Sequence, residues 1–229
     1  MTRVDVMAGD TPVEWSRLVL RGPDAVSFLD GQWTQTTPEK SGDSAKGAVL
    51  QPDGVVVCAV NALRTGLHDV ALDVPRDCAE LLETRLRRFR LRVRVDFEWD
   101  LNPVGEFTTV AEQVDLGAPG PREFAVGYVA QSFGERFVAE RISFTKGCFT
   151  GQELVGRLDA RGGSAPYRLA RVEAAALEDV EQWQSSWESE AQRRGALTTV
   201  MTHEGGVRAL ALVHRTTNLQ GEGWTGEWL

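Results

Sequence analysis

The sequence is poor in the residues that build disulfide scaffolds and metal sites. It contains only three cysteines, Cys58, Cys78 and Cys148, and no two of them form a Cys-x-x-Cys pair. They are too few and too widely spaced for a disulfide framework or a cysteine-based zinc site. The three histidines are equally isolated, so we expect them to be surface residues or satisfied interior residues. The sequence therefore predicts no metal site.

Positive charge and long apolar runs are also lacking. The formal net charge is -8, which argues against a general binder of nucleic acids or anionic membranes, because lysine and arginine supply most phosphate contacts. No run of about 18 apolar residues is present, and Met1–Asp5 do not begin the apolar core of a secretory signal. We expect no direct nucleic-acid partner, no membrane span and a cytoplasmic location.

Turn residues separate short apolar segments in the first half of the chain. Gly47–Gln51 and Val55–Val60 flank Pro52-Asp53-Gly54, whose turn chemistry predicts a β-hairpin. A further strand is expected over 67–73, after Thr65-Gly66. The chain of 229 residues is long enough for one large domain or two small ones.

A helix and another strand are expected next. Asp77 and Glu80 have the spacing of a capping box. Apolar residues then recur at helical spacing, at Cys78, Leu81, Leu82, Leu86 and Phe89. The segment 91–95 alternates with period two, which predicts a half-buried strand. Hairpin, strand, helix and strand in this order predict an α+β fold with a mostly antiparallel sheet.

A glycine-rich break at 161–166 suggests the main domain boundary. We place one domain at 1–163 and a smaller one at 164–229. In the second, Tyr167–Ala174 reads as a strand. A helical stripe follows, with Leu177, Val180, Trp183, Trp187 and Ala191, and Arg193-Arg194-Gly195 are typical of a helix end.

The most informative segment is the octet Lys146-Gly147-Cys148-Phe149-Thr150-Gly151-Gln152-Glu153. A segment so polar and rich in glycine predicts a shaped loop rather than part of a core. The run that follows it predicts a helix starting near Gly151, whose first backbone N–H groups lack partners within the helix.

Cys148 has two interpretations of about equal weight. Close to Lys146 and to a helix N-terminus, its thiolate would be stabilised, which favours a reactive thiol with a redox or exchange role. Alternatively it is a small buried hydrophobic residue, as most single cysteines are. For Cys58 and Cys78, which lie on apolar faces, we expect the buried role.

The octet resembles the K-G-C-Y-x-G-Q-E signature of the YgfZ family of folate-binding proteins, relatives of the glycine-cleavage T-protein. Phe149 replaces the usual tyrosine. The flanking residues are also similar to the family, at 142–144, Arg157 and 161–162, as are 20–25 and 28–35 near the start and 195–199 and 209–215 near the end. The resemblance spans nearly the whole chain.

This resemblance implies a fold and a function. The fold would be an antiparallel-sheet folate-binding domain followed by a small carboxy-terminal β-barrel-like domain, which the helix after 177 suggests is shortened or remodelled. The ligand would be tetrahydrofolate or a derivative. The function would be support for assembly or repair of iron–sulfur enzymes, including those that modify tRNA, with Cys148 as the functional thiol and iron–sulfur enzymes or assembly proteins as partners.

The resemblance also points to folate-binding candidates, which are Lys146, Cys148, Gln152, Glu153 and Arg157. A carboxylate and an amide side by side match the donors and acceptors of a pterin edge. Neighbours on a helix point about 100° apart, however, so only one of Gln152 and Glu153 would face the ligand. Glu153 is equally well explained as a first-turn acid that complements the helix dipole. Glu140 is an alternative carboxylate.

A transferase activity is disfavoured. The T-protein carries a Gly-Gly-x-x-Asp-Asp segment, whereas the corresponding stretch here, 54–58, has no acid. Electrostatic or general-base help to an attacking amine would be missing. We assign no turnover reaction, and keep aminomethyl transfer and a folate-independent interaction module as alternatives.

Two further features have a structural and a functional interpretation. The arginines 85, 87, 88, 90, 92 and 94 predict a solvated helix face and strand edge, or less often a landing site for a polyglutamate tail or an acidic partner. Trp33 is expected in the core, with a pocket wall as the alternative.

Overall fold

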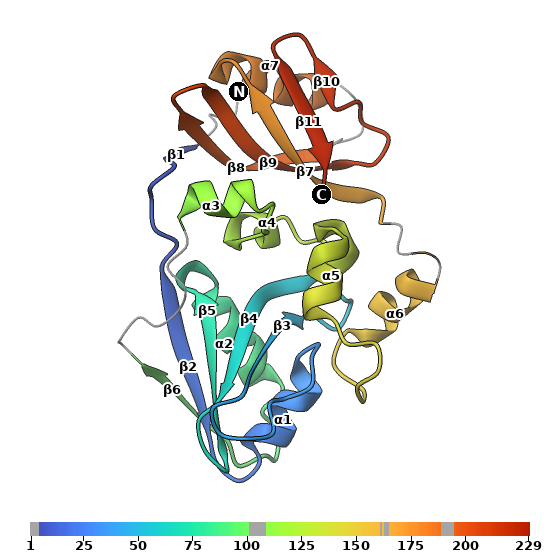
Figure 1. Ribbon diagram of the computed structural model, residues 1–229. Coiled ribbons are helices and arrows are strands. Elements are labelled where there is room, and N and C mark those ends of the chain that lie inside the picture. The colour runs from blue at the N-terminus through green and yellow to red at the C-terminus, as the bar shows by residue number, and fades with distance from the viewer. Residues whose placement is uncertain (1–4, 101–108, 161, 163–164, 189–194) are drawn as a thin grey trace.

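The computed structural model describes residues 5–100, 109–160, 162, 165–188 and 195–229. Two β-sheets lie at opposite ends of the molecule, and helices α3, α4 and α5 lie between them (Figure 1). The class is mixed α+β with mostly antiparallel pairing, as predicted.

The first sheet has five strands in the order β3-β4-β5-β2-β6, and every neighbouring pair is antiparallel. The strands are β2 (Trp15–Arg21), β3 (Ser44–Leu50), β4 (Val56–Arg64), β5 (Asp69–Pro75) and β6 (Asp96–Asp100). The predicted hairpin is confirmed as β3 and β4, and the strand expected at 67–73 is β5. Helices α1 (Ala25–Gln32) and α2 (Ala79–Arg88) contact β5 and β4 respectively.

Two local predictions in this region are wrong. The segment 91–95 forms no strand, because Leu91 is 74% exposed, Arg92 has a left-handed φ of 59°, and the Arg94 N–H donates to the Asp24 carboxylate. The strand starts only at Asp96. The capping box at Asp77 is also absent, because a short 3-10 turn, η1 (Arg76–Cys78), precedes α2 and its N-cap residue Cys78 makes no side-chain capping bond.

The connecting helices bridge the two sheets. They are α3 (Val110–Asp115), α4 (Pro121–Ala125), η2 (Ala130–Phe133), α5 (Glu135–Arg141) and α6 (Gln152–Ala160). Helix α4 contacts β4 of the first sheet and strands β8 and β9 of the second. Leu169, Met201, Leu210 and Leu212 of the second sheet belong to the same buried cluster as the core of the first. The core is therefore continuous between the sheets.

The second sheet has the order β1-β8-β9-β7-β11-β10. Its strands are β1 (Val6–Ala8), β7 (Tyr167–Ala174), β8 (Gly195–His203), β9 (Gly206–His214), β10 (Gln220–Gly221) and β11 (Trp224–Trp228). Strand β7 matches its predicted range. The expected barrel is not confirmed, since the described strands form an open sheet with β1 and β10 at its edges.

The predicted helix in this half is α7 (Leu177–Glu188), whose Val180 and Trp183 are buried against the sheet. Ala191 and Arg193-Arg194 lie outside the described residues, and Gly195 begins β8. The division of the chain after residue 163 stays a prediction. Strand β1 pairs in parallel with β8, so residues near the start of the chain complete the second sheet. None of the helices in the described ranges is long and apolar enough to cross a membrane.

Glu123 of α4 connects the helices to the second sheet. Its fully buried carboxylate accepts hydrogen bonds from the Gly120 N–H at 2.7 Å and from the Thr199 hydroxyl of β8 at 2.7 Å. Burial raises the pKa of Glu123 above its ordinary value of 4.5, and these hydrogen bonds oppose the shift.

The raised pKa predicts a dependence of stability on pH. Between pH 4.5 and the raised pKa, the folded state holds a proton on Glu123 that the unfolded state releases. The contribution of Glu123 to the free energy of unfolding should therefore fall as the pH rises through this window. Urea unfolding at a series of pH values should show this fall in the wild type relative to Glu123→Gln. If the free energy of unfolding of the wild type, relative to that of Glu123→Gln, instead rises with pH, the assignment is contradicted.

Candidate functional site

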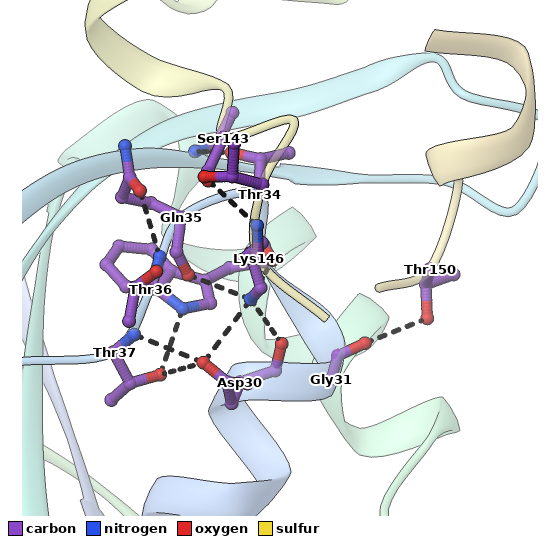
Figure 2. Close-up of polar contacts among 12 residues, drawn as sticks. Asp30, Gly31, Thr34, Gln35, Thr36, Thr37, Ser143, Lys146 and Thr150 are labelled. Atoms are coloured by element: carbon purple, nitrogen blue, oxygen red, sulfur yellow. Dashed lines mark hydrogen bonds and ion pairs between the residues drawn. The ribbon is translucent and has the colours of Figure 1, made fainter. Parts of the chain in front are cut away.

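The octet forms the predicted loop up to Gly151, and hydrogen bonds on both sides of Cys148 tie this region to the end of α1 and to the segment that follows it (Figure 2). Three residues before the octet, the Ser143 N–H donates to the Thr34 carbonyl at 2.8 Å. Within the octet, the Thr150 N–H donates to the carbonyl of Gly31, in the last turn of α1, at 3.1 Å. The predicted helix follows immediately as α6, after Gly151 with a φ of +86°. The loop is therefore anchored on both sides of Cys148.

Lys146 caps the end of α1 from outside the helix. Its side chain is only 2% exposed, and Nζ donates to the carbonyl oxygens of Asp30 at 2.6 Å, Trp33 at 3.1 Å and Gln35 at 2.8 Å. The last carbonyls of a helix lack partners within it and favour a nearby cation, and α1 has no basic residue in its own last turn. Lys146 supplies that cation.

Asp30 completes this cluster. Its Oδ1 lies 3.3 Å from Lys146 Nζ and accepts hydrogen bonds from both the backbone N–H and the hydroxyl of Thr37. Burial lowers the pKa of Lys146, and the charge of Asp30 opposes that shift. The Thr37 hydroxyl oxygen also accepts from the indole N–H of Trp33, which is fully buried and belongs to the core. The pocket-wall interpretation of Trp33 is therefore not supported.

Cys148 is exposed between two buried side chains. The Lys146 side chain precedes it, Phe149 with 7% exposure follows it, and Lys146 Nζ lies 5.6 Å from the centre of the Phe149 ring. The interpretation of Cys148 as a buried hydrophobic residue is wrong. Cys58 and Cys78 are buried, as expected.

This arrangement predicts that the three thiols differ sharply in reactivity. Burial raises the pKa of the Cys78 thiol to about 12 and raises that of Cys58 as well. An aromatic disulfide reagent should modify Cys148 at once, whereas Cys58 and Cys78 should react only as the protein opens. Absorbance of the released thiolate measures this, and Cys148→Ser should abolish the fast phase. A fast phase that survives in Cys148→Ser would contradict the prediction.

A second buried cation supports the far end of the loop. Arg85 of α2 is 3% exposed, and it donates to the Leu50 carbonyl at 2.8 Å and to Gln32 Oε1 at 3.1 Å. The Thr150 hydroxyl donates to the same Gln32 oxygen. Burial lowers the pKa of Arg85 to about 10, and the neighbouring Arg88 adds to the shift. Gln32 thus joins α1, α2 and the loop.

The prediction of a solvated arginine face is wrong for Arg85. Its position, three residues after the buried Leu82 and four before Phe89, places it on the apolar stripe of α2, and this signal was present in the sequence. Arginines 87, 88, 92 and 94 are exposed, as that interpretation required, whereas Arg90 is half-buried.

The remaining predicted residues lie on α6. Glu153 and Arg157 form an ion pair one turn apart, and the Glu153 side chain is 85% exposed. Gln152 is half-buried at the first position of the helix. Lys146 thus lies in a buried cluster and Cys148 on an exposed loop. The pair Glu153 and Arg157 lies on an exposed face of α6. Their roles toward a folate stay predictions.

Helix α5 lines a cavity of about 150 Å³ beside the second sheet. The Glu140 carboxylate there accepts from Arg136 Nε at 2.8 Å, and this bond lowers the pKa of Glu140. Phe137 and Arg141 also line the cavity. The guanidinium of Arg141 donates to the Gly47 and Val60 carbonyls, so β3 and β4 fix its position.

Cys58 ends the stretch 54–58, which has no acid where the T-protein carries its aspartates, and it lies in the core of the first sheet. It is 0% exposed, and the charges that act on its pKa come from Cys78 and Arg141 rather than from a carboxylate.

Comparison with known proteins gives the fold class of this arrangement. No protein-family model matches the chain, and no curated protein matches it in sequence. Among solved structures, the chain is similar to the glycine cleavage system aminomethyltransferase T of Bartonella henselae, with a TM-score of 0.55 over 96% of this chain and 84% of the other. The two sequences are 12% identical, so the likeness shows the fold alone. The chain has an aminomethyltransferase T-like fold.

Proposed function

We propose that the chain is a cytoplasmic tetrahydrofolate-binding protein of the YgfZ type that supports the assembly or repair of iron–sulfur enzymes, including tRNA-modifying ones. The exposure of Cys148 on a loop anchored at both ends is the observation that carries the proposal. The resemblance of the octet to the family signature and the T-like fold support it.

The cavity beside α5 is the favoured place for the pterin end of the folate. Glu140 offers a carboxylate acceptor, Phe137 an apolar ring and Arg136 a donor. Ligand pockets for whole drug-sized molecules are typically about 300–1,000 Å³, so a cavity of about 150 Å³ would take one end of the ligand. Glu153 is a weaker candidate, because its side chain is 85% exposed against 40% for Glu140, whereas both carboxylates pair with an arginine one turn away.

Aminomethyl transfer remains the disfavoured alternative. It would need a carboxylate near Cys58, whereas the described groups whose charges act on the pKa of this buried thiol are Cys78 and Arg141. An interaction module that does not bind folate is the second alternative.

The thiol role is tested in cells whose own copy of the gene has been deleted. We expect wild-type protein to restore tRNA thiolation and Cys148→Ala to fail, while the folded protein accumulates normally. Thr145→Ala is the matched control, because Thr145 is exposed on the same loop and carries no thiol. Full activity of Cys148→Ala would refute the thiol role.

The site of the folate is tested with two carboxylate variants. Glu140→Gln should weaken tetrahydrofolate binding by about tenfold, because a carboxylate that accepts from the pterin is lost. Glu153→Gln should leave binding unchanged. If Glu153→Gln weakens binding and Glu140→Gln does not, the folate site lies at α6 instead of at the cavity beside α5.

A further inference from the structure

A second and larger cavity lies at the junction of the two sheets, away from the Cys148 loop. It has a volume of about 370 Å³, within the range typical of small-molecule sites, and such sites favour the boundaries between structural units. It is bounded by the link from β1 to β2, the end of β5, helices α3 and α4, and β8 (Figure 1).

The polar part of this cavity is held in place by a buried carboxylate. Gln113 and Thr199 both line the cavity, and both donate to Glu123, from Nε2 at 3.2 Å and from the hydroxyl at 2.7 Å. A hydroxyl has a single proton, so the Thr199 oxygen can only accept a further hydrogen bond. The Gln113 amide, with its nitrogen toward Glu123, has its carbonyl oxygen as an acceptor and keeps its second N–H as a donor. Glu123 therefore fixes two acceptors at the cavity wall.

The rest of the lining is largely apolar, with Thr11 and four charged residues, Glu14, Arg76, Asp77 and Arg122, whose formal charges cancel. The apolar wall consists of Met7, Pro12, Val13, Pro75, Val110 and Pro121. At the edge, Arg76 pairs with Glu14 and Arg122 pairs with Asp5, each at 2.5 Å. Because both guanidinium groups are already paired with carboxylates, the arginines do not require an anionic ligand.

We propose that this cavity binds a small uncharged molecule with an apolar body and an N–H or O–H donor at one end, such as a primary amide, a lactam or a phenol. The donor end meets Thr199 and Gln113, and the body lies against the prolines and valines. This site is separate from the folate site proposed above and does not depend on it.

Benzamide is a suitable probe, because it combines a ring with a primary amide. Titration of the full chain, followed by amide chemical shifts, should give saturable changes confined to the residues around the cavity. Thr199→Val should weaken benzamide binding about five- to tenfold, since one neutral hydrogen bond is lost. Thr198→Val is the matched control, because Thr198 is the adjacent buried threonine of β8 and its hydroxyl donates to the Leu210 carbonyl at 3.0 Å, but it does not line the cavity.

The outcomes separate clearly. Equal weakening in both threonine variants, shift changes elsewhere on the protein, or no saturable change in the wild type would each overturn the proposal. If the variants do not fold, the wild-type titration alone tests the proposal: saturable shift changes around the cavity support it, and changes elsewhere overturn it. Tetrahydrofolate binding should be the same in Thr199→Val and the wild type, so failure of this proposal leaves the proposed function intact.

Discussion

Replacing Lys146 with methionine should destabilise the protein by about 3 kcal/mol, because it leaves several buried or half-buried acceptors without a donor. The carbonyls of Asp30, Trp33 and Gln35 all accept from Nζ, and methionine fills the same space without a donor. The loss is reduced by the release of a buried charge, since burial already lowers the pKa of Lys146. Urea unfolding measures the effect.

The same variant should also change the loop. Without the cap, the segment around Cys148 loses its buried anchor, and hydrogen exchange at 143–151 should become faster than in the wild type. Lys40→Met is the control, because Lys40 is exposed and its side chain makes no described contact. If Lys146→Met is as stable as Lys40→Met, Lys146 does not cap α1.

Gly151→Ala should cost about 3 kcal/mol or more, because two penalties coincide. Gly151 has a φ of +86°, which strains any residue with a Cβ. A Cβ at this position would also lie 2.5 Å from the Gln51 carbonyl oxygen and 2.9 Å from the Leu50 Cβ. Either the turn between β3 and β4 or the start of α6 must move.

Gly147→Ala is a matched control within the same octet. A Cβ at Gly147 would meet nothing within 4 Å, and its φ is not in the left-handed region. We expect a change in the free energy of unfolding within about 0.5 kcal/mol. Similar losses in both variants would mean that the close contact of the loop with the β3–β4 turn is not what requires glycine at 151.

Short-range patterns in the sequence predicted the local elements well. The turn chemistry at Pro52-Asp53-Gly54 gave the β3–β4 hairpin, and the apolar spacing from Cys78 to Phe89 gave α2. The segment 91–95 failed because its alternation did not reflect burial. A side chain distant in sequence, Asp24, takes the Arg94 N–H that a strand ladder would use. Period two alone does not reveal such competition.

Long-range pairing was beyond the sequence. Strand β1 joins β8 in parallel although almost the whole chain separates them, and nothing in Val6–Ala8 marks its partner. The open second sheet, in place of the expected barrel, depends on such pairings.

The candidate site was predicted in part. The octet identified the loop and the helix that follows it, and Cys148 is accessible as a functional thiol requires. The contacts of Lys146 were not predictable, because its partners lie more than a hundred positions away at the end of α1. Gln32 was missed for the same reason, since its bond to Arg85 joins two helices, whereas the burial of Arg85 could have been predicted from its position on the apolar stripe of α2.

Calorimetric titration of the purified protein with tetrahydrofolate tests the central claim most directly. The account predicts saturable binding of one ligand per chain, with Cys148→Ala binding as tightly as the wild type, because the thiol acts after the folate is bound. Absence of binding in the wild type, under conditions where the protein is folded, would contradict the claim and leave the interaction module as the function of this fold.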